Sequence, residues 1–171
     1  MPRTLPTWGY LLIFCGLIVA NHTIYRDASA PRLLTVTVFA AGKGTAALVQ
    51  APSGATLLID TGSDASILRA LGTILPMWQR SLNTILLTSD SAKNVGGLPF
   101  IRDRYKIGEI LKTGGQDRPY GAPIIFNKNI LITPVAPGVA TVSYGTTSLT
   151  VSSSTPVGTY TSDGLTIARI K

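Results

Sequence analysis

Apolar and polar residues alternate in the part of the chain that begins near residue 33. Residues 33–40 read LLTVTVFA, and residues 45–60 read TAALVQAPSGATLLID with a Pro-Ser-Gly turn inside. Alternation with a period of two is typical of strands, and Pro and Gly mark turns between them. The pattern therefore predicts two or three short strands that begin a sheet.

Helical spacing follows this sheet. The apolar residues that recur at helical intervals are Ile67, Leu68, Leu71, Ile74 and Leu75. Ser63 and Asp64 are suitable capping residues ahead of them, and Pro76 ends the pattern. A strand at 82–88 comes next, and then a helix from about Val95 to Tyr105, in which Pro99 is tolerated because it falls in the first turn.

The rest of the chain predicts strands separated by Gly, Pro and Asn turns. They read GEILK, NILITPV, ATVSYG, SLTVSSS and GLTIARIK, and the last of them ends at Lys171. The order of elements predicts an α/β fold, a mixed β-sheet with two helices on one face.

An apolar segment, WGYLLIFCGLIVA, occupies residues 8–20. Extended from Leu5 to Tyr25, it reaches the roughly 20 residues that span a bilayer, with aromatic residues near both ends. This predicts a membrane location with a single-pass N-terminal transmembrane helix. A cleaved signal peptide is the alternative, with Arg3 as its positive region and Ala28-Ser29-Ala30 as its cleavage site, although Pro31 would follow the cut. Residues 1–30 are predicted to be the membrane anchor, or signal peptide, with its linker.

The composition of the chain limits the kinds of partner and site that it can have. Only 13% of residues are charged, and the net charge is +7, which suits an anionic partner or serves solubility alone. Cys15 and His22 are the only residues of their types. An intrachain disulfide and a zinc site with several imidazoles are therefore excluded. His22 lies just beyond the apolar segment, which argues against a Ser-His-Asp triad.

Two further stretches of the sequence are similar to motifs of a known protein family. Residues 58–62 read LIDTG and residues 88–97 read TSDSAKNVGG. Together with the strands and helix around them, they resemble the N-terminal half of the metallo-β-lactamase fold, and in particular the domain attached to competence DNA-uptake channel proteins of the ComEC type. The likeness covers residues 33 to about 111 well and 112–171 loosely. It implies an αββα sandwich in which intact relatives bind zinc.

The resemblance also implies that the metal ligands have been lost. The family pattern Thr-His-x-His-x-Asp-His-x-Gly-Gly falls on residues 88–97, where Ser89, Ser91, Lys93 and Asn94 replace three histidines and one aspartate. Serine and amide oxygens are poor zinc ligands, and the Lys93 charge repels a cation. Asp60 is retained beside the site, and we expect Lys93 to pair with it or with Asp90. No cofactor is expected.

Gly96 and Gly97 also allow a simpler interpretation of residues 86–97, in which the segment has only a structural role. On that reading it is a strand, a turn and a helix cap, and the glycines allow close packing of the helix.

Basic residues follow this segment. They are Arg102, Arg104, Lys106, Lys112 and Arg118. They are candidate nucleic-acid contacts, or else the solvated end of a helix.

The length of the chain sets the last expectation. Residues 31–171 are predicted to be a degenerate half-domain, truncated to the N-terminal half of the fold, so that nothing in the chain covers the second face of its sheet. A homodimer or a protein supplying the missing half would then cover that face. The sequence favours a non-catalytic, membrane-anchored binding or assembly module, that is, a pseudoenzyme. Whether the chain keeps any enzymatic activity stays open. The alternatives are a residual metal-dependent hydrolase completed by a partner chain and a basic DNA-binding domain.

Overall fold

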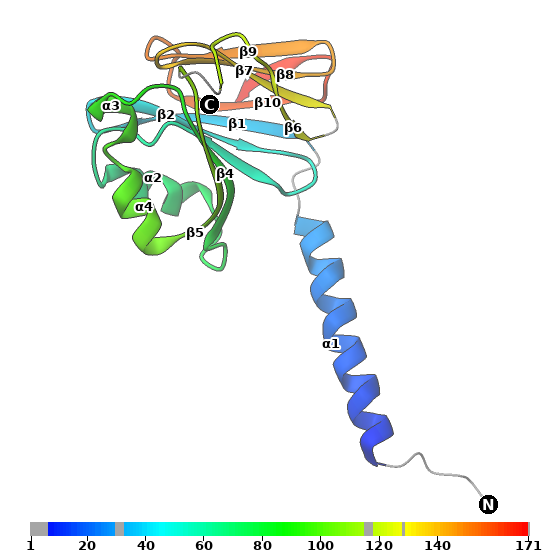
Figure 1. Cartoon of the computed structure of the whole chain (residues 1–171). Coiled ribbons are helices and arrows are strands. Elements are labelled where there is room, and N and C mark those ends of the chain that lie inside the picture. The colour runs from blue at the N-terminus through cyan, green and yellow to red at the C-terminus, as the bar shows by residue number, and fades with distance from the viewer. Residues whose placement is uncertain (1–6, 30–32, 115–117, 128, 171) are drawn as a thin grey trace, which may run out of the picture.

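The computed structural model describes residues 7–29, 33–114, 118–127 and 129–170. Arg3, Ala30 and Pro31, which carry part of the signal-peptide alternative, lie outside these residues. The fold is mixed α/β. Two sheets pack face to face, and short helices cover the outer face of the larger sheet (Figure 1).

The larger sheet has seven strands in the order β11-β10-β1-β2-β3-β4-β5. They are β1 (Leu34–Ala41), β2 (Gly44–Gln50), β3 (Thr56–Ile59), β4 (Ser81–Leu87), β5 (Lys106–Lys112), β10 (Gly158–Ser162) and β11 (Ile167–Ile170). Strands β3, β4 and β5 are parallel to one another, and all other neighbours are antiparallel. The prediction of a mixed sheet is therefore confirmed.

Strand direction gives the larger sheet two distinct ends. Because β1 and β3 are both antiparallel to β2, strand β1 runs in the same direction as β3, β4 and β5. We call the end where these four strands begin, near Leu34 and Ser81, the entry end. The end where they finish, near Ile59 and Leu87, is the exit end.

Three short helices form the outer layer: α2 (Ser66–Ile74), α3 (Ala92–Val95) and α4 (Leu98–Arg104). Ile67, Leu71 and Ile101 are buried against the sheet, as the helical spacing predicts. The second predicted helix, from about Val95 to Tyr105, corresponds to α4, which begins at Leu98, and the short helix α3 before it was not predicted.

The two glycines are required by close contact with the loop after β3. A Cβ atom on Gly97 would lie 2.2 Å from the Thr61 carbonyl oxygen, and one on Gly96 would lie 2.3 Å from that of Ser63. No side chain fits at these distances, so the predicted role of the glycines in close packing is confirmed.

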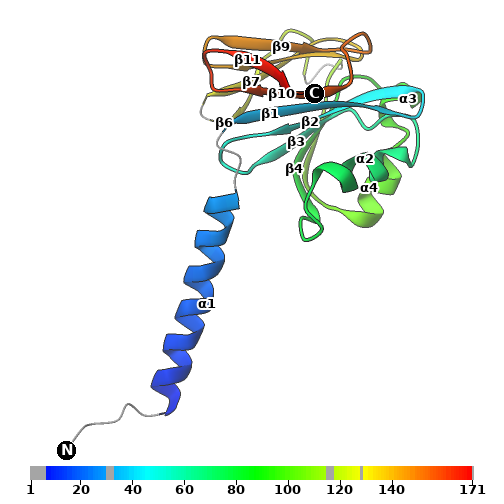
Figure 2. The same cartoon turned by 180° about the vertical axis from the view of Figure 1, so that it is seen from behind.

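The second sheet has four strands in the order β6-β7-β8-β9. They are β6 (Ile124–Asn127), β7 (Ile130–Ala136), β8 (Val139–Tyr144) and β9 (Thr147–Val151). Their buried residues, among them Ile130, Ile132 and Val142, pack on Val36, Val49 and Leu57 of the larger sheet. Figure 2 shows the second sheet stacked on the larger one.

The prediction that nothing in the chain covers the second face is therefore wrong. The strands after residue 123 do not all extend the first sheet. Those between 124 and 151 turn back as a sheet of their own and bury that face.

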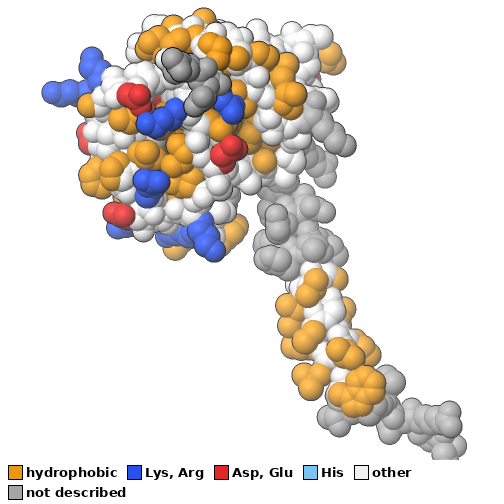
Figure 3. All heavy atoms as spheres, viewed as in Figure 1, with side chains coloured by type: hydrophobic (Ala, Val, Ile, Leu, Met, Phe, Trp, Pro, Cys, Tyr) orange, Lys and Arg blue, Asp and Glu red, His pale blue; other side chains and the backbone are white. Residues whose placement is uncertain are grey.

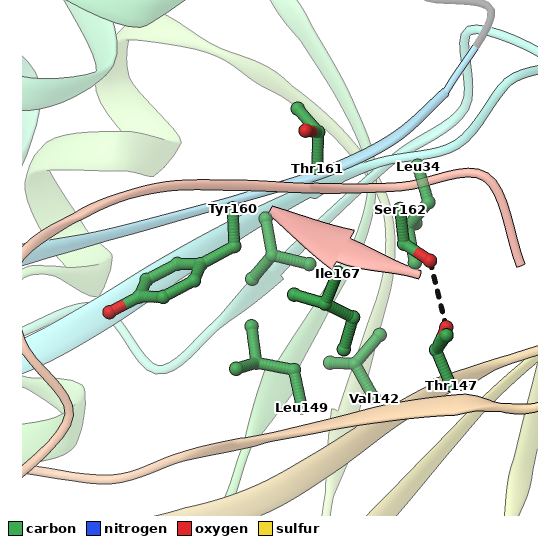
Figure 4. Close-up of a pocket in the computed structure, with 9 residues that line it drawn as sticks. Leu34, Val142, Thr147, Leu149, Tyr160, Thr161, Ser162 and Ile167 are labelled. Carbon is green, nitrogen blue, oxygen red and sulfur yellow. Dashed lines mark hydrogen bonds between the residues drawn. The ribbon is translucent and has the colours of Figure 1, made fainter. Parts of the chain in front are cut away.

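The two sheets also meet through a polar contact near the β10–β11 edge. The Ser162 and Thr147 hydroxyl oxygens are 2.7 Å apart, and Ile167, Val142 and Leu149 surround a small gap beside them (Figure 4). The gap has a volume of about 10 Å³, roughly the space of one water molecule, so it is a packing defect and not a ligand site.

Helix α1 (Thr7–Ser29) stands away from the sandwich (Figure 1). Its described side chains are exposed, including Leu11, Phe14 and Leu17. Among the residues that the structure describes, no helix has the length and hydropathy of a membrane span. The anchor therefore stays a prediction.

The role of the second sheet can be tested by two substitutions of the same kind. Ile132 is fully buried between the sheets, whereas Ile125 is 75% exposed on the outer face. Ile132→Ala should lower the free energy of unfolding by about 2 to 5 kcal/mol, and Ile125→Ala should change it by less than about 0.5 kcal/mol. Urea unfolding followed by circular dichroism measures both, and equal effects would contradict the sandwich.

Candidate functional site

The exit end of the larger sheet gathers polar side chains. Asp60, Thr88 and Thr113 each directly follow one of the three parallel strands, and all three are buried. The carboxyl ends of parallel strands are where α/β proteins commonly place their sites. This end is therefore the first place to look for function.

Asp60 adopts an unusual backbone conformation. Its φ angle is 55°, which makes it the one residue other than glycine with a positive φ in the described chain. Asp tolerates this region better than most residues, but the conformation still costs energy and persists only where surroundings fix it. Here the Asp60 amide donates to the Leu86 carbonyl at 2.8 Å, and the strand pairing thus holds the residue in place.

The Asp60 carboxylate binds the end of the neighbouring strand. Oδ1 accepts from the Thr88 amide at 2.8 Å, and Oδ2 accepts from the Thr88 hydroxyl at 2.7 Å. Oδ2 also accepts from the Asn94 side-chain amide at 3.0 Å. Donors of the chain itself therefore use three of the roughly four acceptor positions of this carboxylate.

Thr88 extends these contacts to the second sheet. Its hydroxyl oxygen accepts from the Gly138 amide, in the β7–β8 turn, at 2.8 Å and from Asn94 Nδ2 at 3.1 Å. Its carbonyl accepts from the Tyr120 hydroxyl at 2.6 Å. One residue thus links β3, β4, α3 and the second sheet.

Asn94 joins the same network from α3. Its carbonyl accepts from both the amide and the hydroxyl of Thr61, at 2.7 and 2.9 Å, and its Oδ1 accepts from the Ser91 hydroxyl at 3.2 Å. With Nδ2 directed at Asp60, Asn94 supplies a donor where the family resemblance expects a metal ligand. We call Asp60, Thr88 and Asn94 the polar cluster.

The protonation of Asp60 reflects its surroundings. Burial raises the pKa of the Asp60 carboxyl to about 6, and the hydrogen bonds from Thr88 and Asn94 act in the opposite direction. The desolvation of the charge is therefore stronger than its stabilisation by donors.

Of the four replaced ligand positions, only Asn94 reaches Asp60. Ser91 and Lys93 are exposed, and Ser89 Oγ accepts from the Ser91 amide at 3.0 Å. The expected pairing of Lys93 with Asp60 or Asp90 is wrong, because Lys112 pairs with Asp90 at 3.2 Å and the polar cluster holds Asp60. Lys93 forms no ion pair among the described residues.

The predicted basic residues fall at the two ends of β5. Lys112 and Arg118 line an open hollow of about 370 Å³ at the exit end, together with Ser89, Asp90 and Tyr120. Arg102, Arg104 and Lys106 lie near the entry end, where α4 finishes and β5 begins. Six strand steps of about 3.3 Å separate Lys106 from Lys112 by about 20 Å. The five residues therefore do not form one continuous patch.

Thr88 and Gly138 are the site residues that the sequence did not single out. A threonine at the end of a buried strand is common, and the contact with Gly138 joins residues 50 positions apart. The only feature of the sequence that points to Thr88 is its place at the first position of the family pattern.

Two comparisons with known proteins did not identify a related protein. No protein-family model and no curated protein matches the chain. The resemblance to the metallo-β-lactamase fold thus remains a hypothesis that rests on residues 58–62 and 88–97 and on the strands and helices around them.

The central role of the Thr88 hydroxyl can be tested by near-isosteric substitution. Thr88→Val removes a donor to Asp60 and the acceptor of Asn94 and Gly138, so the free energy of unfolding should fall by about 2 to 4 kcal/mol. Thr88→Ser keeps the hydroxyl and should cost only about 1 kcal/mol for the lost methyl group. Chemical unfolding measures both, and equal losses would show that the hydroxyl does not matter.

The raised pKa of Asp60 predicts a pH dependence of stability. The folded protein keeps this proton up to about pH 6, whereas the unfolded chain releases it near 3.8. Between these values the folded state binds more protons, so the contribution of Asp60 falls as pH rises, by about 3 kcal/mol in total. The difference in stability between wild type and Asp60→Asn should shrink accordingly from pH 4 to pH 7.

Asp64 provides the matched control. Hydrogen bonds, first of all from Ser66, lower the pKa of this exposed carboxyl. The difference between wild type and Asp64→Asn should therefore grow as pH rises. If the Asp60 difference also grew, the ionised Asp60 carboxylate would be the stabilised form, and the description of the polar cluster would be wrong.

Proposed function

We propose that this chain is a catalytically inactive, membrane-anchored module of the metallo-β-lactamase type, related to competence DNA-uptake proteins and acting in binding or assembly. The observation that carries the proposal is the polar cluster. At the strand ends where the family resemblance expects a metal, the chain uses the Asp60 carboxylate to hold its own elements together.

The chemistry of the donors supports the loss of metal binding. Zinc is held by thiolates, imidazoles and carboxylates with free lone pairs. Here Asn94 directs an N–H at Asp60, and no group of three or more His, Cys, Asp or Glu side chains comes together in the described part of the chain. The residues present do not fit zinc. A hydrolase completed by a partner would need that partner to supply ligands that this chain lacks.

The layers of the fold are compatible with the resemblance. An αββα sandwich has a helical layer outside each sheet, and this chain has helices outside the larger sheet alone, as far as the structure describes it. The outer face of the second sheet carries exposed Ile125, Leu131 and Val135. Ile125 and Leu131 are cross-strand partners, and neighbouring exposed apolar residues favour an assembly role over a free surface.

Helix α1 supports membrane attachment. Apolar side chains follow one another around it from Leu11 to Phe14 and from Leu17 to Val19, and all of them are more than half exposed (Figure 3). A helix that is apolar on every side is usually buried or surrounded by lipid, not laid against a groove by one face. The proposal therefore places this segment in the bilayer.

A nucleic-acid contact is a second candidate. The hollow at the exit end brings Lys112 and Arg118 together with the hydroxyl of Ser89, and two cations beside a hydroxyl suit a phosphate. The hydroxyls of Tyr120 and Thr113 in the same hollow already donate to the Thr88 and Leu87 carbonyls. Asp90 lies in the same hollow and pairs with Lys112, which opposes an anion. DNA binding at this hollow would weaken with salt and with Arg118→Ala.

Metal content tests the proposed loss of catalysis. The full chain, purified after expression with added zinc, manganese and iron, should contain none of these metals in stoichiometric amount by elemental analysis. Lys93→Asp combined with Asn94→His should not restore hydrolysis, because Ser89 and Ser91 still leave the ligand set incomplete. One tightly held metal per wild-type chain would overturn the proposal.

A further inference from the structure

We propose that the entry end of the larger sheet is a second membrane contact. Met77 and Trp78 insert into the lipid interface there, and the basic residues beside them meet anionic phospholipid headgroups. This inference rests on the proposed anchoring by α1 and adds which part of the domain lies against the bilayer.

The loop between α2 and β4 presents two large apolar side chains to solvent. Met77 is 85% exposed and Trp78 is 76% exposed, whereas Leu75 just before them is buried. The Gln79 amide donates to the Pro76 carbonyl at 2.9 Å, which closes a turn with Met77 and Trp78 at its tip. Tryptophan is enriched where a membrane meets water, because its ring is apolar and its N–H is polar.

Basic residues surround this turn. Arg80 follows it directly, and Lys106 is its neighbour on β5, since the Lys106 amide donates to the Arg80 carbonyl at 2.8 Å. Arg102 and Arg104 in the last turn of α4 are exposed close by, with Asp103 between them. The four cations thus exceed the acidic charge, and Figure 3 shows Lys and Arg side chains at the lower end of the domain.

Sheet topology places α1 at the same end. Strand β1 begins at Leu34, on the entry end, and α1 finishes at Ser29. The intervening residues reach at most about 18 Å, so the end of α1 lies near this edge whatever their path. In Figures 1 and 2, α1 extends from the side of the domain on which the α2–β4 turn lies.

Leu33 and Leu165 are two more exposed apolar residues, one at the start of β1 and one beyond β10 in the strand order. Leu33 directly precedes β1, and Leu165 lies in the β10–β11 turn, which the pairing of Ser162 with Leu34 puts at the entry end. Leu33 therefore adds an apolar side chain beside the attachment point of α1, whereas the β10–β11 turn packs on the β8–β9 turn, where the Thr146 amide donates to the Gly164 carbonyl at 2.8 Å.

Charge decides between a bilayer and a second copy of the chain as the occupant. Two copies that met through this end by twofold symmetry would bring the same four cations together, and like charges oppose each other. An anionic lipid surface complements these cations and also accepts Met77 and Trp78. We therefore assign the surface to anionic phospholipid.

The two tryptophans of the chain allow a direct test. Trp8 lies in α1 and Trp78 in the proposed contact, so Trp8→Phe and Trp78→Phe each leave one reporter. The full chain is reconstituted in vesicles of equal parts phosphatidylglycerol and phosphatidylcholine, with bromine atoms high on the acyl chains. Quenching by bromine reports contact with lipid, and quenching by acrylamide reports contact with water.

We expect bromine to quench Trp78 in these vesicles, and we expect the quenching to weaken in pure phosphatidylcholine, at high salt and in an Arg80→Glu, Lys106→Glu variant. Trp78 that stays open to acrylamide, with Trp8 quenched by bromine, would overturn the second contact and leave the anchor intact. Trp78 shielded from acrylamide but not quenched by bromine would mean that protein covers it, and would equally overturn the inference. If bromine does not quench Trp8, anchoring by α1 fails, whatever Trp78 shows.

Discussion

The contact on which the exit end of this protein depends is the one between the Asp60 carboxylate and Thr88. A buried carboxylate is costly unless donors surround it, and this one receives the amide and hydroxyl of Thr88 and the amide of Asn94. Through the Thr88 hydroxyl the same contact reaches Gly138 in the second sheet. Strand ends, helix α3 and second sheet are thus positioned by one small group of hydrogen bonds.

The ends of the parallel strands need polar groups between them whether or not a metal is present. Loops that converge on the ends of parallel strands require something polar between them, either an ion with its ligands or side chains that satisfy each other. Asn94 makes the second solution work, because it donates to Asp60 while its carbonyl accepts from Thr61. On our proposal the fold has thereby kept its shape without the metal and has been left to binding and anchoring.

The sequence predicts the local elements better than their long-range partners. Periodicity predicted the first strands and helix α2, since each depends on neighbours in the chain. The close packing of Gly96 and Gly97 was predicted from the absence of their side chains, but not that the loop after β3 is what they contact. Periodicity missed β10, whose GTYTS has little apolar pattern and which pairs with β1 across more than a hundred residues. It also missed that the later strands fold back, because alternation shows that a strand has a buried face but not which surface buries it.

The same limit applies to the candidate site. Asp60 and Asn94 were identified by position in a family pattern, but the direction of the Asn94 amide and the role of Thr88 depend on how three loops meet. The measurement that tests the account most directly is the titration of Asp60 by NMR of its carboxyl carbon, with and without zinc. The account predicts a midpoint near pH 6 that zinc does not move. A midpoint that one equivalent of zinc lowers by more than one pH unit would mean that this carboxylate still binds metal, and would contradict it.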